Sequence, residues 1–334
     1  MAAYLDTNLL VQRSGLDSLE LSTAQALCRE AGVEIVVPVI VADEVESSRR
    51  RIVEAAFDAL RAAHREAARY GPIAHLAELP TPGELARAYR DRLEATFATV
   101  ATPDDAPAEA LRREAFRLRP ARAGSGARDA AIWLTVRDDH LQRAESGYFV
   151  TNNSRDFAAH GDPSALHPSL ADEVAGHAHP LSLFPSVADL AAELAEEAEV
   201  LVDEGLLRTL DGFDRAVRRL FQEPDFMAGI RPPPELRASE EGRLFVASDM
   251  STRATALHDA RGYRIEDRRV TVGRVAFEAA FELGTLEKAG AGQVQKMLPV
   301  TCAVTALVWF VESAAGADPA VEISQVVATK VNAV

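Results

Sequence analysis

The feature that most constrains the fold is a regular alternation of short apolar segments and longer helical segments in residues 1–165. Ala2–Leu5, Val33–Val37 and Tyr148–Thr151 are short and rich in apolar or β-branched residues, which is typical of buried strands. Strands that alternate with helices form a parallel sheet with both faces covered. We therefore expect an α/β domain in which a parallel sheet is flanked by helices.

The segments between these strands have apolar residues at helical spacing. Gly32 ends the first of them, and Pro38 opens the second, since proline is tolerated in a first helical turn. The helices expected in this domain span 18–30, 38–69, 83–98, 107–118 and 127–141. Residues 46–122 would form a helical insert in the domain.

The amino-acid composition of the chain changes after about residue 165. Residues 166–230 are rich in Ala, Glu and Leu and are expected to be a helical linker, with helices over 186–207 and 211–221. Residues 231–334 predict a second, α+β domain that is mainly an antiparallel sheet. Its expected strands are 244–249, 263–265, 269–283, 297–312 and 321–331. The segment has no functional motif, so regulation, dimerisation and substrate positioning stay equally open for it.

Composition excludes several classes of protein. The net charge of -15 argues against a broad basic coat for nucleic acid, although an acidic site that binds cations contributes to that count. Cys28 and Cys302 exclude a disulfide framework and a cysteine-rich zinc site, and both are expected to be buried as small hydrophobic residues. With no apolar run of membrane-spanning length and no room for a signal peptide before Asp6, a cytoplasmic protein without a membrane partner is expected.

Carboxylates stand where the expected strands end or the helices begin. They are Asp6, Glu44, Asp129 and Asp156. In an open parallel sheet, ligands bind beyond the carboxyl ends of the strands, so separate segments would bring these oxygens to one edge. Hard divalent cations take oxygen ligands. The pattern indicates metal-assisted cleavage of a phosphodiester.

As a set, these motifs resemble those of the PIN-domain ribonucleases. The carrying residues are Leu5-Asp6-Thr7-Asn8-Leu9-Leu10; Pro38, Val41 and Glu44; Asp129 with Ala130 and Ile132; and Val150-Thr151-Asn152-Asn153 followed by Asp156-Phe157. The chain looks most like larger bacterial members with a helical insert and a C-terminal extension. It departs from the family pattern at Asn153, where an acid is usual, and in the long insert.

The resemblance implies a metal-dependent endoribonuclease that leaves 5′-phosphate and 3′-hydroxyl ends. Asp6, Glu44 and Asp129 would be catalytic residues that hold one or two Mg²⁺ or Mn²⁺ ions, together with Asp156 or Asn153. Which of the last two completes the metal site is open.

Polar and basic residues beside the acids are candidates for substrate binding. They are Thr7, Asn8, Thr151, Asn152, Arg128, Arg112, Arg113 and Arg117. Arginines steer a phosphate backbone. The alternative is that these arginines pair with Glu109 and Glu114 on a solvated helix face.

A second function is a PIN-fold module that has lost cleavage and binds RNA or a protein, an alternative that Asn153 keeps open. A phosphohydrolase for small substrates is a third, although the chain has no motif that recognises a small molecule. The class of RNA, cleavage of single-stranded DNA, a protein inhibitor as in toxin–antitoxin or defence systems, and homo-oligomerisation are also open.

Overall fold

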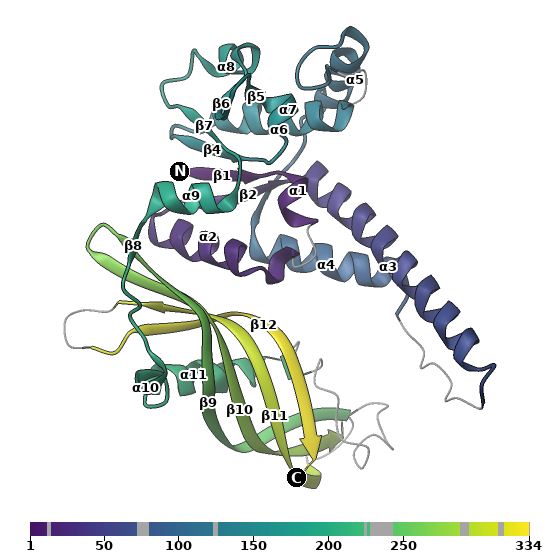
Figure 1. Cartoon of the computed structure of the whole chain (residues 1–334), viewed down its shortest axis with the longest axis vertical. Coiled ribbons are helices and arrows are strands. Elements are labelled where there is room, and N and C mark those ends of the chain that lie inside the picture. The colour runs from purple at the N-terminus through teal and green to yellow at the C-terminus, as the bar shows by residue number, and fades with distance from the viewer. Residues whose placement is uncertain are drawn as a thin grey trace. The chain divides into compact units, whose positions relative to one another are not determined.

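The computed structural model describes residues 1–11, 15–71, 80–122, 126–223, 226–227, 243–287, 294–312 and 317–333. The chain divides into two compact units (Figure 1). The first unit comprises Met1–Leu16 and Cys28–Ala191, and the second comprises Asp17–Leu27 and Ala192–Val334. Helix α2 (Leu19–Glu30) is therefore shared between them.

The first unit is built on a parallel sheet, as the sequence predicts. Its strand order is β3-β2-β1-β4-β7, and every neighbouring pair is parallel. The strands are β1 (Ala2–Leu5), β2 (Glu34–Pro38), β3 (Ala98–Val100), β4 (Gly147–Val150) and β7 (Leu181–Phe184). All the residues of β1 are buried, because it lies at the centre of a sheet with helices on its faces.

Helices connect these strands. They are α1 (Thr7–Leu10), α3 (Val39–Ala67), α4 (Pro82–Thr96), α5 (Ala106–Phe116), α6 (Ala127–Gln142), α7 (Ser154–Phe157), α8 (Pro168–Val174) and α9 (Val187–Leu194), the last reaching into the second unit. A 3-10 turn (Gly15–Asp17) precedes α2, and β5 (Ala158–Ala159) pairs with β6 (Asp162–Leu166). In the described part of the chain, no helix has the length and apolar character needed to cross a membrane.

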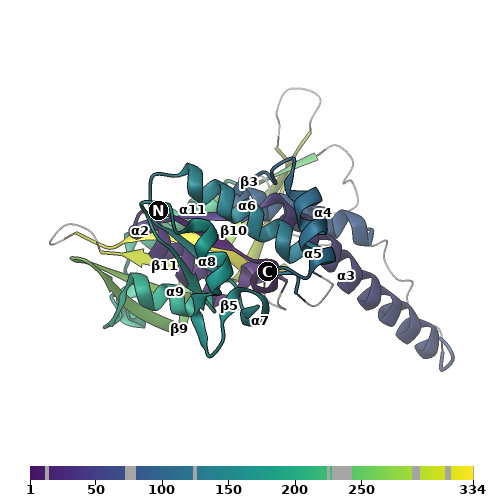
Figure 2. The same cartoon turned by 90° about the horizontal axis from the view of Figure 1, so that it is seen from above.

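Helices α3 and α4 pack side by side, and α3 continues well past α4 (Figure 2). Arg90 on α4 joins them, since its guanidinium donates to Asp43 at 2.5 Å and to Glu46 at 3.1 Å. A capping box starts α4: the Thr81 hydroxyl accepts the Glu84 N–H, and the Glu84 carboxylate accepts the Thr81 N–H. These contacts fix the first turns of α3, on which Glu44 lies.

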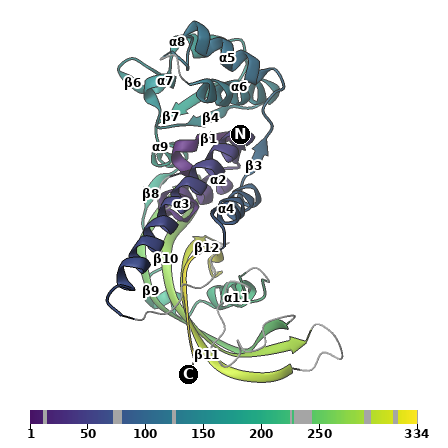
Figure 3. The ribbon, with the colours of Figure 1, turned by 90° about the vertical axis from the view of Figure 1, so that its right-hand side faces the viewer.

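The second unit contains an antiparallel sheet of long strands, also as predicted. Its order is β12-β11-β10-β9-β8. The strands are β8 (Glu196–Ala198), β9 (Arg243–Ile265), β10 (Arg268–Glu287), β11 (Val294–Val311) and β12 (Ala320–Ala333). They are strongly bent, and α11 (Asp211–Leu220), which follows the short α10 (Glu204–Leu207), lies on their concave side (Figure 3).

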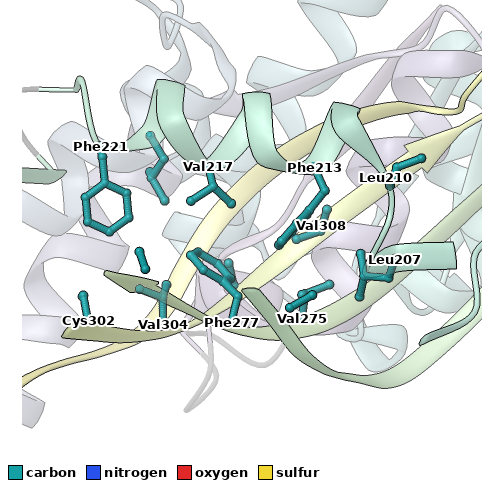
Figure 4. Packing of buried hydrophobic residues seen from close by; sticks show 14 of the residues in the cluster. Leu207, Leu210, Phe213, Val217, Phe221, Val275, Phe277, Cys302, Val304 and Val308 are labelled. Carbon is teal, nitrogen blue, oxygen red and sulfur yellow. The ribbon is translucent and has the colours of Figure 1, made fainter. Parts of the chain in front are cut away.

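The core of the second unit lies between α11 and the sheet (Figure 4). Phe213, on the apolar face of α11, meets Phe277 edge-to-face at 5.5 Å between ring centroids. Around this contact pack Val217 of α11 and Val304 of β11, both buried, together with Cys302, which is buried as expected. Alternate residues of β10 and β11 point to this side, so the sheet needs the helix to cover it.

Residues of α2 that belong to the second unit also contact the sheet. The Trp309 Nε1–H donates to the Ser22 hydroxyl at 2.8 Å, and the hydroxyls of Ser22 and Ser324 lie 3.1 Å apart. These bonds satisfy polar groups in a largely buried place.

The secondary structure differs from the expectation in several places. The single helix expected over 186–207 is wrong: the structure has α9, β8 and α10 there, because β8 pairs with β9 and this pairing overrides a helical composition. The strands expected over 244–249 and 263–265 are parts of the unbroken β9. Strands β3 and β7 were not expected, and the first unit extends to Ala191, beyond the expected boundary at 165.

A candidate acidic site at the carboxyl edge of the parallel sheet

Asp6 follows β1 and is only 1% exposed. Its Oδ1 accepts the Thr7 N–H at 2.7 Å, and its Oδ2 accepts the Thr151 hydroxyl at 2.5 Å and the Asn8 amide at 3.4 Å. Leu5 is in register with Val150 on the parallel neighbour β4, so the residues that follow the two strands emerge at the same level of the sheet. The topology of the sheet thus brings Asp6 and Thr151 together.

Glu44 lies in the second turn of α3 and faces the same edge. Its Oε2 accepts the Thr7 hydroxyl at 2.8 Å, and its Oε1 accepts Arg128 Nη1 at 2.6 Å. Thr7 therefore links the two acids, since its backbone N–H binds Asp6 and its side chain binds Glu44.

Asp129 lies in the first turn of α6, and two local features fix where that helix starts. Gly126 has a φ of 126°, a conformation that side chains rarely adopt, and it opens the helix. The Ala127 N–H donates to the Glu114 carboxylate at 2.8 Å, which satisfies one of the free N–H groups of the first turn.

The pKa of Asp129 reflects the charges of the other three acids. The pKa of Asp129 is raised to about 6, first by burial and then by the negative charges of Asp6, Asp156 and Glu44, against the opposing charge of Arg128. Burial also raises the pKa of Asp6; its hydrogen bonds from Thr151 and Thr7 work against this, whereas the charge of Glu44 adds to it. The carboxylates that follow β1 or lie on α3, α6 and α7 repel one another, and a cation among them would relieve that repulsion.

Both candidates for the fourth metal ligand, Asp156 and Asn153, lie on or next to α7. Asp156 lies on α7, close enough for its charge to act on Asp129. Asn153 precedes α7; its backbone N–H donates to the Thr151 hydroxyl at 3.0 Å, and its side chain makes no capping bond to the helix.

The donor set suits a hard divalent ion, because every candidate ligand offers oxygen. In the arrangement that the structure describes, however, no three His, Cys, Asp or Glu side chains form a group that could hold a metal ion. The guanidinium of Arg128 lies on Glu44, so one of these acids already has a cationic partner.

The polar residues expected to bind substrate divide into two kinds. Thr7 and Thr151 are 6% and 1% exposed, and their hydroxyls are bonded to Glu44 and Asp6. These bonds orient the two acids, and direct contact of either threonine with substrate stays a prediction. Asn8 bonds to Asp6, whereas Asn152 and Arg128 have exposed side chains.

The arginines of α5 also divide. Arg113 is 7% exposed, and its guanidinium binds Glu109, Glu173 and the carbonyl of Arg119, so its donors already have partners within the protein. Arg112 is exposed but forms a two-bond ion pair with Glu109, as the alternative interpretation predicts. Arg117 is exposed, and its role stays a prediction.

Two acids that support the site were not predicted from the sequence. Glu114 caps α6, and Glu173 binds Arg113, Arg137 and the Trp133 indole. No local pattern identifies either one, since each partner lies 13 to 60 residues away.

A parallel sheet flanked by helices, with acids gathered at its carboxyl edge, makes the first unit an α/β domain with a candidate acidic site. Residues 4–157 match the family described as the PIN domain, in agreement with the motifs, and this match supports a nuclease fold for that part of the chain. No curated protein matches the chain. Among solved structures, VapBC2 from Rickettsia felis bound to a DNA fragment from their promoter is similar at 13% identity and a TM-score of 0.30, covering 46% of this chain and 90% of that one. A likeness this weak says nothing about the activity or partners of this protein.

Proposed function

We propose that the first unit is an endoribonuclease that depends on Mg²⁺ or Mn²⁺ and leaves 5′-phosphate and 3′-hydroxyl ends. The observation that carries the proposal is the bonded series Thr151–Asp6–Thr7–Glu44, with Asp129 and Asp156 within electrostatic reach. Acids held this firmly against their mutual repulsion are typical of a cation-binding site.

Asp6, Glu44 and Asp129 would hold the ion, and Asp156 or Asn153 would complete the site. When bound, the ion would supply an activated water and offset the charge that develops on the leaving oxygen. Asp6 is already oriented by three hydrogen bonds, so it needs little reorganisation to act as a ligand.

Arg128 is exposed and lies beside Glu44, which places its cationic end at the rim of the acidic site. In the proposed reaction it contacts a phosphate of the RNA strand. RNA is the proposed substrate; a protein inhibitor, self-association and a cytoplasmic location stay predictions.

The test compares the wild type with Asp6→Asn, Glu44→Gln and Asp129→Asn in a cleavage assay on single-stranded RNA with Mn²⁺. Each variant should lose activity by about 100-fold or more, the scale of losing one electrostatic contact at a reacting centre. Asp104→Asn, which neutralises an exposed acid before α5, is the matched control and should retain full activity. Equal activity in all five proteins would refute the proposal.

The second candidate, a binding module without cleavage, is favoured by the Arg128–Glu44 pair and by the departure at Asn153. Calorimetry with Mn²⁺ separates the two. A nuclease should bind the ion, and Asp129→Asn should weaken that binding. A module should bind RNA with no uptake of Mn²⁺ and no cleavage.

A further inference from the structure

Positive charge is distributed unevenly around the acidic site. Arg112 and Arg113 are neutralised by acids on α5 and α8. Arg119, Arg122 and Arg155, in contrast, form no ion pair with any carboxylate among the described residues. The charge of these three arginines is therefore not offset by a bound carboxylate, although the chain has a net charge of -15.

Arg155 lies on α7, and direct contacts join Arg119 and His167 to this helix. Arg119 Nη1 donates to the backbone carbonyl of Arg155, and Arg119 Nε is buried without a hydrogen-bond partner among the described residues. His167 attaches to the same helix, since its N–H donates to the Phe157 carbonyl at 2.8 Å. We call Arg119, Arg122, Arg155 and His167 the basic cluster.

The charges of Arg119 and Arg122 both act on the imidazole of His167, which relates Arg122 to the same place. Burial, and then the charges of Arg119 and Arg122, lower its pKa below the ordinary histidine value. Its Nδ1 accepts the Ser169 N–H at 3.2 Å, so the neutral ring has its proton on Nε2 and can donate from there. The cluster thus consists of hydrogen-bond donors, with the surplus positive charge of its arginines.

The basic cluster borders the acidic site. Arg155 is the neighbour of Asp156 on α7, and the charge of Asp156 acts on Asp129. A strand whose scissile bond lies at the acids would therefore have an adjacent phosphate within reach of the cluster. Planar arginine donors suit the paired oxygens of a phosphodiester.

We propose that the basic cluster binds the phosphodiester backbone of the nucleic-acid strand next to the cleaved bond, and so sets the path of the strand across α7. This inference rests on the proposed nuclease function, and it replaces Arg112 and Arg113 by Arg119, Arg122 and Arg155 as the residues that hold the substrate.

The experiment measures RNA binding without catalysis, in EDTA and at several salt concentrations. The test variant is Arg122→Gln with Arg155→Gln, because both side chains are exposed and their removal should leave the fold intact. Arg112→Gln is the matched control, since it removes an exposed arginine of the same unit that already has an acidic partner. Unfolding midpoints are compared for all variants.

The double variant should bind RNA more weakly than the wild type does. The slope of log K against log salt should fall by about 0.7 for each phosphate that the variant no longer binds, as for single strands. Arg112→Gln should leave the slope unchanged. An equal weakening in Arg112→Gln, or an unchanged slope in the double variant, would overturn the inference.

A second measurement does not depend on any variant. RNA bound to the cluster adds negative charge beside His167, so NMR titration should show the pKa of His167 rising towards its ordinary value. Single-stranded DNA of the same sequence should raise the pKa of His167 in the same way, because RNA and DNA have the same backbone phosphates. An unchanged pKa of His167, or an equal rise of that pKa with polyglutamate, would contradict phosphate recognition. Neither measurement needs a metal ion or cleavage. A failure of RNA binding by the basic cluster is therefore distinguishable from a failure of the proposed nuclease activity.

Discussion

At the scale of single residues, the site depends on threonines that orient acids. The Thr151 hydroxyl binds Asp6 and also accepts the Asn153 N–H, so one side chain joins the ends of β1 and β4. Thr7 does the same for Asp6 and Glu44. The crowding of negative charge works against this arrangement of acids. Together with burial, it raises the pKa of Asp129 to about 6.

This raised pKa predicts how stability depends on pH without metal. Between the ordinary value of 3.8 and about 6, native Asp129 binds its proton more tightly than the unfolded chain does, so its contribution to stability is lost as the pH rises through this window. Asp129→Asn should therefore stabilise the metal-free protein at pH 7.5, by about 1–2 kcal/mol after allowance for the partial exposure of the carboxyl.

Urea unfolding in EDTA, at pH 4.5 and pH 7.5, checks this prediction. The difference between variant and wild type should be small at the lower pH and larger at the higher one. Asp104→Asn should show no such change with pH. A stabilisation of Asp129→Asn that is the same at both values would contradict the assignment of the charge repulsion to this residue.

At the scale of elements, the position of Asp129 depends on how α6 begins. Gly126 supplies the left-handed backbone before the helix, and a Cβ atom there would lie 3.3 Å from the Ala121 Cα and 3.4 Å from the Asp129 carboxylate. Glu114 of α5 caps the first turn. Helix α5 and the loop after it thus set the start of the helix that carries one of the acids.

Gly126→Ala should destabilise the protein by about 1–3 kcal/mol, the cost of holding a non-glycine residue in a rare backbone conformation. It should also weaken Mn²⁺ binding, because the new methyl group crowds Asp129. Gly176→Ala is the control: its Cβ would meet open space, and the change should stay within about 0.5 kcal/mol. Equal stability of the two variants in urea would contradict this account of the helix start.

At the scale of the whole molecule, each unit has a core of its own. The core of the first unit surrounds β1 and β4 and includes the Phe149–Phe157 pair, whose ring centroids are 5.1 Å apart. That of the second unit lies between α11 and the bent sheet and includes the Phe213–Phe277 pair. Because the cores are separate, a destabilising substitution in one unit should speed up hydrogen exchange mainly within that unit.

Phe277→Ala should therefore cost about 3–5 kcal/mol, since it leaves a cavity in a buried place. Hydrogen exchange should speed up in α11 and in β9 to β11, with little change in β1, β2 and β4. Phe149→Ala is the reciprocal variant and should show the opposite pattern. Equal acceleration across both sheets in either variant would contradict separate cores.

Local patterns were enough to predict a parallel sheet with three of its strands, the long helices around it and the acids at its edge. Buried strands, helix caps and glycine or proline boundaries act over a few residues, so they can be identified in Val33–Val37 or around Pro38 directly. The same patterns failed at 186–207, where composition favours a helix but pairing between β8 and β9 decides.

The sequence by itself determined which residue types reach the carboxyl edge, because the ends of strands and the starts of helices are set locally. Only the tertiary structure decided how they are used: Thr7 and Thr151 orient acids, Arg113 is buried among acidic partners, and Arg119, Arg122 and Arg155 have no carboxylate partner in the described part of the chain. The physical reason is that hydrogen bonds and ion pairs form between side chains far apart in the chain, and local spacing carries no information about which of them meet.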